Sequence, residues 1–217
     1  MGQCGTVDDT RPAHRAEEHD PGEPGPLLAA VGFEPRAVVL AEGISDRCAL
    51  EAVARRHGRD LEHERVAIVP IGGAQAIGRH LEQFGPRGLD LRVAGICDAG
   101  EETDYRRGLE RAGLGSGLTR PEMEELGVYV CVADLEDELI RALGAAAVER
   151  VVAAQGDLGA FRTLQKQAAW RGQPADQQLR RFMGSGGRRK IRYASLLVEA
   201  LEPDRIPRPL DLVLAGI

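Results

Sequence analysis

Short apolar runs that alternate with helical patterns constrain the fold of this chain more than any other feature of its sequence. The runs lie at residues 37–41 (AVVLA), 66–70 (VAIVP), 91–97 (LRVAGIC) and 128–132 (VYVCV). Continuous apolar runs are typical of strands buried on both faces of a parallel sheet. Parallel strands also need long crossover connections, which helices between the runs would supply. The pattern predicts a doubly wound α/β fold with about four parallel strands flanked by helices.

The chain of 217 residues is long enough for one sizeable domain with an extension. Residues 1–35 are rich in Pro, Gly and charged side chains, which predicts a disordered or loosely docked leader. Residues 36–143 contain the apolar runs and form the predicted core, whereas residues 144–217 predict a helical extension packed on that core. Helical patterns cover residues 45–57, 75–84, 103–112, 135–143, 145–155, 158–170, 176–183 and 189–201, before an apolar tail at 207–217.

The overall composition excludes several classes of protein. The formal net charge is −6, so the chain is not a globally basic nucleic-acid coat protein. No apolar run approaches the roughly 18 to 20 residues of a membrane span, and the N-terminus lacks the apolar segment of a secretory signal. The four cysteines are scattered and form no CxxC motif, which argues against a zinc knuckle or a disulfide framework. These features predict a cytoplasmic protein without a membrane partner.

The charge is distributed unevenly along the chain. Residues 157–217 contain 11 Lys or Arg and 6 Asp or Glu, a net charge of +5, so the remainder has a net charge of −11. An acidic body beside a basic segment fits a metal-centred site next to a phosphate-binding track. Ordinary surface charge is the alternative interpretation.

Acidic residues follow three of the four predicted strands. Glu42 follows the first run and Asp46 comes four residues later, whereas Asp98 follows the third run and Asp134 the fourth. Ligands of open parallel sheets bind at the carboxyl ends of the strands, so folding would gather these acids. Clustered carboxylates raise one another's pKa unless a cation neutralises them. An oxygen-only site of this kind suits Mg²⁺ or Mn²⁺.

Each acid also has a purely structural interpretation. Asp46 would be favourable near the positive N-terminus of its predicted helix. Asp134 and Asp137 have the spacing of a helix N-cap and its third residue. Glu101 and Glu138 are compatible with solvated surface positions.

The ordered set of these elements resembles a known domain. An apolar strand ending in Glu42-Gly43, then Asp46, then Ile71-Gly72-Gly73, then a strand ending at Asp98, resembles the Rossmann-like TOPRIM domain. Type IA and II topoisomerases, bacterial primases, small ribonucleases that mature ribosomal RNA, and OLD-family nucleases share this domain. The likeness is strongest to the TOPRIM half of OLD-family ATP-dependent endonucleases. It covers about residues 36–200, including 130–144 (VCVADLEDELIRALG) and 184–194 (GSGGRRKIRYA).

The resemblance implies a role for several residues. Glu42 and Lys190 would be catalytic, with Lys190 placed to stabilise charge that develops on the phosphate. The implied ligands of Mg²⁺ or Mn²⁺ are Glu42, Asp46, Asp98 and Glu136. Further candidate ligands are Glu102, Asp134 and Glu138.

One position departs from the TOPRIM pattern. The family usually carries Asp-x-Asp, whereas this chain has Asp98-Ala99-Gly100. Glu101 or Glu102 could replace the second aspartate, and the sequence leaves open whether one or two ions bind. The ATPase half of OLD proteins is not among these residues, so ATP dependence would require a separate ATPase.

A basic cluster lies near the implied catalytic lysine. Arginine side chains there would bind backbone phosphates in a salt-dependent and largely sequence-independent way. A basic face that serves solubility, or that pairs with the acidic body, is the alternative. The arginines of this cluster are Arg180, Arg181, Arg188, Arg189 and Arg192.

The leading hypothesis is a metal-dependent, OLD-like TOPRIM nuclease that nicks or cleaves DNA. The second is a TOPRIM nuclease that processes RNA, or another nucleotidyl-transfer enzyme. The third is a catalytically degenerate TOPRIM that binds nucleic acid or a partner protein, which the missing second aspartate favours. The expected partners are nucleic acid (DNA ahead of RNA), a separate ATPase and a second copy of the chain.

Overall fold

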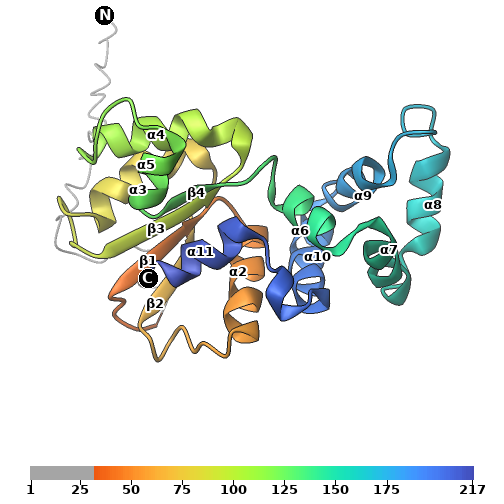
Figure 1. Ribbon diagram of the computed structural model, residues 1–217, viewed down its shortest axis with the longest axis horizontal. Helices are drawn as coiled ribbons and strands as arrows, with labels where there is room; N and C mark the ends of the chain where they lie inside the picture. Colours follow the sequence, from red (N-terminus) through yellow and green to blue (C-terminus); the bar gives the residue numbers. More distant parts are fainter. Residues whose placement is uncertain (1–31) are drawn as a thin grey trace, which may run out of the picture.

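The structure is a computed structural model that describes residues 32–217. The predicted leader at residues 1–35 falls almost entirely outside the described residues. Four parallel strands form one sheet in the order β2-β1-β3-β4 (Figure 1). The strands are β1 (Ala37–Ala41), β2 (Val66–Pro70), β3 (Arg92–Cys97) and β4 (Val128–Val130). The predicted α/β class and parallel sheet are confirmed.

The central strand β1 is buried on both of its faces. All five of its residues are inaccessible to solvent. Ala37 is in register with Val66 of β2 on one side and with Arg92 of β3 on the other. Alternate side chains of β1 point to opposite faces, so Val38 and Leu40 enter one hydrophobic cluster while Ala37, Val39 and Ala41 enter the other. A continuous apolar run is therefore what this position requires.

Helices cover both faces of the sheet (Figure 1). Helices α3, α4 and α5 bury side chains such as Phe84, Tyr105 and Met123 in one cluster. Helices α2, α10 and α11 cover the other face. The helices are α2 (Ile44–Arg56), α3 (Ile77–Phe84), α4 (Glu102–Arg111), α5 (Arg120–Glu125), α6 (Leu135–Leu143), α7 (Ala145–Ala154), α8 (Leu158–Lys166), α9 (Ala175–Met183), α10 (Gly187–Ala200) and α11 (Arg208–Ala215).

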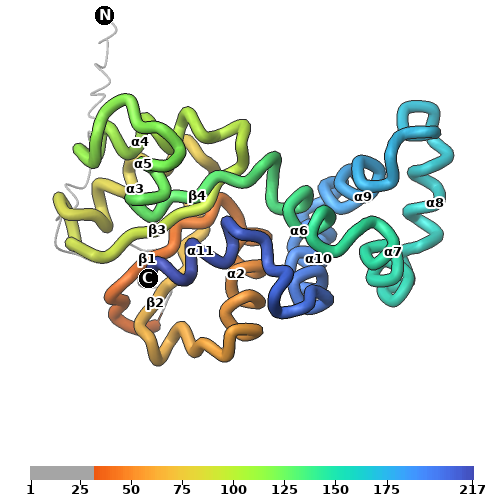
Figure 2. The backbone as a smooth tube through the Cα atoms, in the orientation of Figure 1, coloured from red at the N-terminus to blue at the C-terminus, as the bar shows by residue number. Residues whose placement is uncertain are grey.

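Helices α6 to α10 continue from the sheet to one side of the molecule (Figure 2). Helix α10 returns from this helical part and packs along α2, with Tyr193 and Leu197 buried. Phe161 of α8 and Phe182 of α9 belong to the same hydrophobic cluster as Val39 of the sheet. The helical part therefore shares a hydrophobic core with the sheet, and α10 connects the two because it packs against both α2 and α6.

The observed elements refine the sequence predictions at their ends. Strands at 37–41 and 66–70 have the predicted bounds, whereas β4 stops two residues early at Val130. Helix α5 was not predicted, although Thr119 and Glu122 form a capping box at its start. Among the described residues, no helix has the length and apolar character needed to cross a bilayer. Cys48, Cys97 and Cys131 are free thiols.

Candidate functional site

Three carboxylates meet at the carboxyl edge of the sheet. Glu42 follows β1, Asp98 follows β3, and Glu101 lies in the 3-10 turn that comes next. One oxygen from each lies within 4.8 Å of the others, a spacing that could accommodate a metal ion. Because β1 and β3 are adjacent parallel strands, their carboxyl ends bring together residues that are distant in sequence.

The loop after β2 fixes the backbone of Glu42. The amide nitrogens of Gly72 and Gly73 both donate to the Glu42 carbonyl, at 3.1 and 3.2 Å. These glycines have φ angles of 76° and 112°, a region that other residues rarely adopt. The Ile71-Gly72-Gly73 element therefore holds the end of β1 in place.

Asp46 lies in the first turn of α2, the helix that begins just after Glu42 at the carboxyl end of β1. Its Oδ2 atom accepts hydrogen bonds from the Gly43 amide at 3.1 Å and from the Ser45 hydroxyl at 3.3 Å. Burial nevertheless raises the pKa of Asp46 above its ordinary value. The side chain thus caps its helix and adds a further acid beside the three-carboxylate cluster.

Without a cation, burial and mutual repulsion disfavour ionisation of the carboxyl groups in this cluster. Burial, and then the neighbouring Glu101 and Asp46 carboxylates, raise the pKa of Glu42 to about 8. Burial followed by repulsion from Glu42 raises the pKa of Asp98 to about 7. The Oε2 atom of Glu101 is buried and has no hydrogen-bond partner within residues 32–217. An unpaired oxygen among acids that resist ionisation fits a bound divalent cation, which would neutralise all of them.

Lys190 is the cation that the fold itself brings to this edge. Its Nζ atom lies 3.5 Å from Oε2 of Glu136. Burial acts to lower the pKa of Lys190, but Glu136, Asp46, Asp98 and Glu42 together raise it above its ordinary value. Burial raises the pKa of Glu136 although Lys190 opposes the shift. Lys190 is therefore a protonated group that pairs with Glu136 and interacts electrostatically with the acids at the sheet edge.

The three further candidate ligands are engaged in other contacts. Glu102 lies next to Glu101 in sequence but forms ion pairs on the surface of α4. Asp134 caps α6, accepting from the Asp137 amide at 2.8 Å. Glu138 accepts from the Val132 amide at 2.7 Å. Their ion-pair partners are Arg120 for Glu102, Arg180 for Asp134 and Arg141 for Glu138, at 2.7, 2.6 and 2.6 Å respectively.

Of the two glutamates that follow Gly100, the structure therefore places Glu101 in the cluster and Glu102 outside it. The deciding feature is the 3-10 turn Ala99–Glu101, which precedes the first residue of α4. The sequence offers both residues equally, because a one-residue difference in where a helix begins is not encoded by any clear pattern. Asp46 and Glu136 lie near Lys190 but outside the three-carboxylate cluster.

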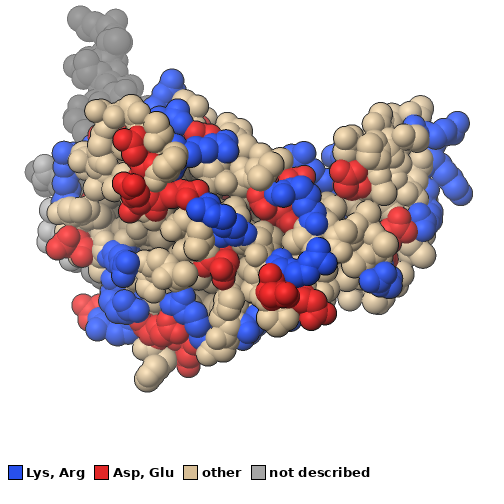
Figure 3. All heavy atoms as spheres, in the orientation of Figure 1, with Lys and Arg blue, Asp and Glu red and all other residues tan. Residues whose placement is uncertain are grey.

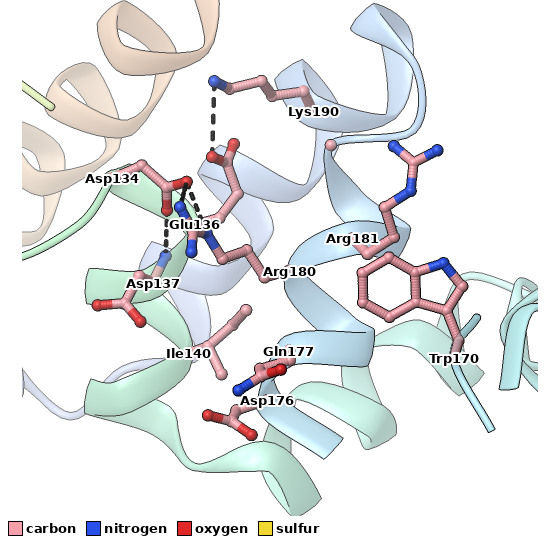
Figure 4. Close-up of a pocket in the computed structure, with 11 residues that line it drawn as sticks. Asp134, Glu136, Asp137, Ile140, Trp170, Asp176, Gln177, Arg180, Arg181 and Lys190 are labelled. Carbon is pink, nitrogen blue, oxygen red and sulfur yellow. Dashed lines mark hydrogen bonds and ion pairs between the residues drawn. The ribbon is translucent and has the colours of Figure 1, made fainter. Parts of the chain in front are cut away.

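A pocket of about 570 Å³ adjoins this site. Glu136 and Lys190 line it at one end, and Trp170 and Arg181 contribute another wall (Figure 4). The walls come from α6, α9 and α10 and from the loop that precedes α9. The pocket therefore lies within the helical part, and it shares Glu136 and Lys190 with the site at the sheet.

The predicted nucleic-acid-binding arginines fall into two groups. Arg180, Arg189 and Arg192 have acidic neighbours, Asp134 for the first and Asp157 for the other two. Arg181 and Arg188 are exposed and have no ion-pair partner in the described part of the chain. Figure 3 shows basic and acidic side chains interspersed on one face of the molecule rather than a single basic patch.

Comparisons with known proteins agree with the fold. Residues 35–99 match the family model described as "Overcoming lysogenization defect protein-like, TOPRIM domain". The C-terminal region of the Burkholderia pseudomallei OLD protein is similar, with a TM-score of 0.63 and 18% identity, over 85% of this chain and 97% of that one. The C-terminal region of the Xanthomonas campestris pv. campestris OLD protein has a TM-score of 0.62 and 22% identity, over 84% and 92%. No curated protein matches the chain. The predicted resemblance and fold are confirmed.

Proposed function

We propose that this chain, which carries an OLD-like TOPRIM domain, is a Mg²⁺- or Mn²⁺-dependent nuclease that hydrolyses phosphodiester bonds of DNA. The three-carboxylate cluster is the observation that carries the proposal, because Glu42, Asp98 and Glu101 lie within 4.8 Å of one another with a lysine nearby. The family match covers residues 35–99, which include Glu42 and Asp98, and it supports a nuclease-type or nucleotidyl-transfer module in general. Carboxylate oxygens are the ligands that these cations prefer.

The side chains have distinct expected roles. Glu42, Asp98 and Glu101 would hold the ion, and Asp46 and Glu136 are candidates for a second position. When bound, the ion supplies Lewis-acid stabilisation of the phosphate oxygens. Lys190 would stabilise the negative charge that develops on the phosphate, since its raised pKa keeps it protonated.

Gly100 bears on how many ions bind. It occupies the position of the second aspartate of Asp-x-Asp, and Glu101 provides a carboxylate one residue later. The cluster therefore retains three acids, which is sufficient for one ion. This substitution is also what favours the alternative function, a degenerate TOPRIM that binds nucleic acid or a partner protein without catalysis. An RNA-processing nuclease is the remaining alternative.

Arg181 and Arg188 support a nucleic-acid substrate, because they are exposed and not neutralised by a described acid. Such side chains bind phosphates with little dependence on sequence. We expect the protein to act in the cytoplasm and any ATP dependence to come from a separate ATPase. A homodimer is the expected assembly.

Nicking of supercoiled plasmid DNA tests the proposal. The wild-type protein is expected to nick the plasmid with Mg²⁺ or Mn²⁺ and to lose this activity in EDTA. Glu42→Ala should abolish nicking. Glu62→Ala is the matched control. Glu62 is an exposed acid in the loop before β2, at the amino ends of the strands and so opposite the carboxylate cluster. Unchanged activity in Glu42→Ala would refute the assignment, and Mn²⁺ binding without nicking by the wild type would favour the degenerate alternative. Parallel assays on single-stranded RNA test the RNA-processing reading.

A further inference from the structure

We propose that the pocket beside the carboxylate cluster receives one unpaired nucleotide of the substrate strand, with its base stacked on Trp170. This pocket is called the Trp170 pocket below and is defined by Glu136, Trp170, Gln177, Arg181 and Lys190. The inference rests on the proposed nuclease function and adds the substrate feature that the site selects, a single-stranded or extruded nucleotide.

The location of the pocket links it to the reaction centre. Lys190 lines the Trp170 pocket and also interacts electrostatically with Asp46, Asp98 and Glu42. Glu136 lines it as well and lies 3.5 Å from Lys190. A strand whose phosphate is held at Lys190 therefore places a neighbouring nucleotide at the mouth of the pocket.

The size of the pocket is compatible with a single nucleotide. Its volume of about 570 Å³ is within the range of roughly 300 to 1,000 Å³ that is typical of small-molecule sites. A paired duplex exposes only phosphates and groove edges, so a base reaches the aromatic side chain of the pocket only after it leaves the stack. Unpaired strands meet this requirement without the cost of extrusion.

The side chains of the pocket match the parts of a nucleotide. Figure 4 shows the indole of Trp170 and the guanidinium of Arg181 on one side, with Ile140 across from them. Trp170 is only partly buried, because it packs against the core while part of its ring system remains accessible. An accessible indole stacks on any base. Gln177 offers both a donor and an acceptor to a base edge.

The charge of the pocket is compatible with a polyanion. Three of the four acids that line it, Asp134, Glu136 and Asp137, pair with Arg180, Lys190 and Arg141 respectively. The fourth, Asp176, is exposed and has no ion-pair partner in the described part of the chain. Arg181 has no ion-pair partner among residues 32–217, so its charge is available to a phosphate. Arg181 is therefore the basic group left for a phosphate, and Asp176 is the one acid of the wall that remains unpaired.

Intrinsic fluorescence tests this proposal directly, because Trp170 is the only tryptophan of the chain. The 217-residue chain in EDTA is titrated with a single-stranded DNA of about 12 nucleotides, a blunt duplex of the same length, and a single strand with abasic sites. Stacking predicts strong quenching by the first ligand and weak quenching by the other two. Anisotropy of a labelled oligonucleotide measures binding independently.

Several outcomes would overturn the proposal. These are equal quenching by duplex and single strand, binding of the single strand without quenching, and no binding of the single strand. Plasmid nicking with Mn²⁺ by the same preparation tests the proposed function separately. Nicking without quenching would overturn the Trp170 pocket alone, whereas quenching without nicking would support the pocket and count against the nuclease.

Substitutions extend the test. Trp170→Ala should weaken single-strand binding by about 5- to 150-fold, the range expected for loss of one stacked base. Trp170→Phe, which keeps an aromatic face, should retain most of the affinity and guards against a folding defect in the alanine variant. Arg181→Ala should weaken binding, whereas Arg171→Ala should not, because Arg171 is an exposed arginine outside the pocket. Equal effects of the two arginine substitutions, or wild-type affinity in Trp170→Ala, would contradict the proposal.

Discussion

The ammonium group of Lys190 lies 3.5 Å from the carboxylate of Glu136, and this contact joins α10 to α6 at the edge of the sheet. Helix α10 also packs along α2, whose first turn carries Asp46. The position of Lys190 therefore depends on helix packing, whereas Glu42 and Asp98 are positioned by the strands. The proposed site is complete only when the helical part is docked on the sheet.

Lys190→Ala is expected to lower kcat by about 100- to 1,000-fold, the loss typical of removing one group that stabilises transition-state charge. Binding of Mn²⁺ should persist, because Lys190 is not a ligand. The matched control is Lys166→Ala, which removes the only other lysine, located at the end of α8. Steady-state nicking kinetics give the comparison. A similar loss in both variants, or wild-type kcat in Lys190→Ala, would contradict the role.

Glu101→Gln is expected to weaken Mn²⁺ binding by at least about tenfold, since ligands matter at least as much as the outer-shell groups whose loss costs 10- to 100-fold. Glu102→Gln should leave Mn²⁺ affinity unchanged, because Glu102 pairs with Arg106 and Arg120. Isothermal titration calorimetry of both variants measures the difference. The reverse pattern would move the third ligand to Glu102.

The metal-free protein is expected to become less stable as the pH rises from about 4.5 to about 8. Glu42 has a folded-state pKa of about 8 and an unfolded value near 4.5, so in this window the folded state binds more protons. Asp98, with a pKa of about 7, acts in the same direction. The stabilisation from these two carboxyl groups is complete at pH values below their unfolded pKa values. It is lost as the pH rises through their folded pKa values.

Thermal unfolding in EDTA across this pH range measures the effect, and Glu42→Gln should flatten the curve. Saturating Mn²⁺ should also reduce the slope, because the ion replaces the protons and its affinity should increase with pH. A metal-free stability that rises steadily from pH 5 to 8, with the same slope in Glu42→Gln, would contradict the electrostatic account.

Asp134→Ala is expected to reduce the free energy of unfolding by about 1 kcal/mol, because Asp134 caps α6. Asp134→Asn should lose less, since asparagine is also a good N-cap. Neither change should alter Mn²⁺ affinity if Asp134 is structural. Loss of Mn²⁺ binding in Asp134→Asn with unchanged stability would instead identify a ligand.

Much of the fold was predictable because its strands are short, apolar and buried on both faces. Strand β1 has the predicted bounds, and the Asp98 position follows from the end of β3. The resemblance to TOPRIM likewise depended on the order along the chain of the residues at the strand ends and the Gly72-Gly73 turn. These are local features, so sequence order was enough to identify them.

The remaining features depend on tertiary packing. Whether Glu101 or Glu102 enters the cluster is decided by where α4 begins, and no residue pattern distinguishes the two. The Trp170 pocket forms only because α9 and α10 return to α6, which spacing along the chain does not reveal. The contact of Arg192 with Asp157, on separate elements, was unpredictable for the same reason.

The most direct test of the central claim is the anomalous scattering of crystals soaked in Mn²⁺. The account predicts a manganese peak bound by carboxylate oxygens of Glu42, Asp98 and Glu101, with Lys190 nearby and no peak in crystals of Glu42→Ala. Manganese bound elsewhere, or no manganese between these three side chains at saturating concentration, would contradict it.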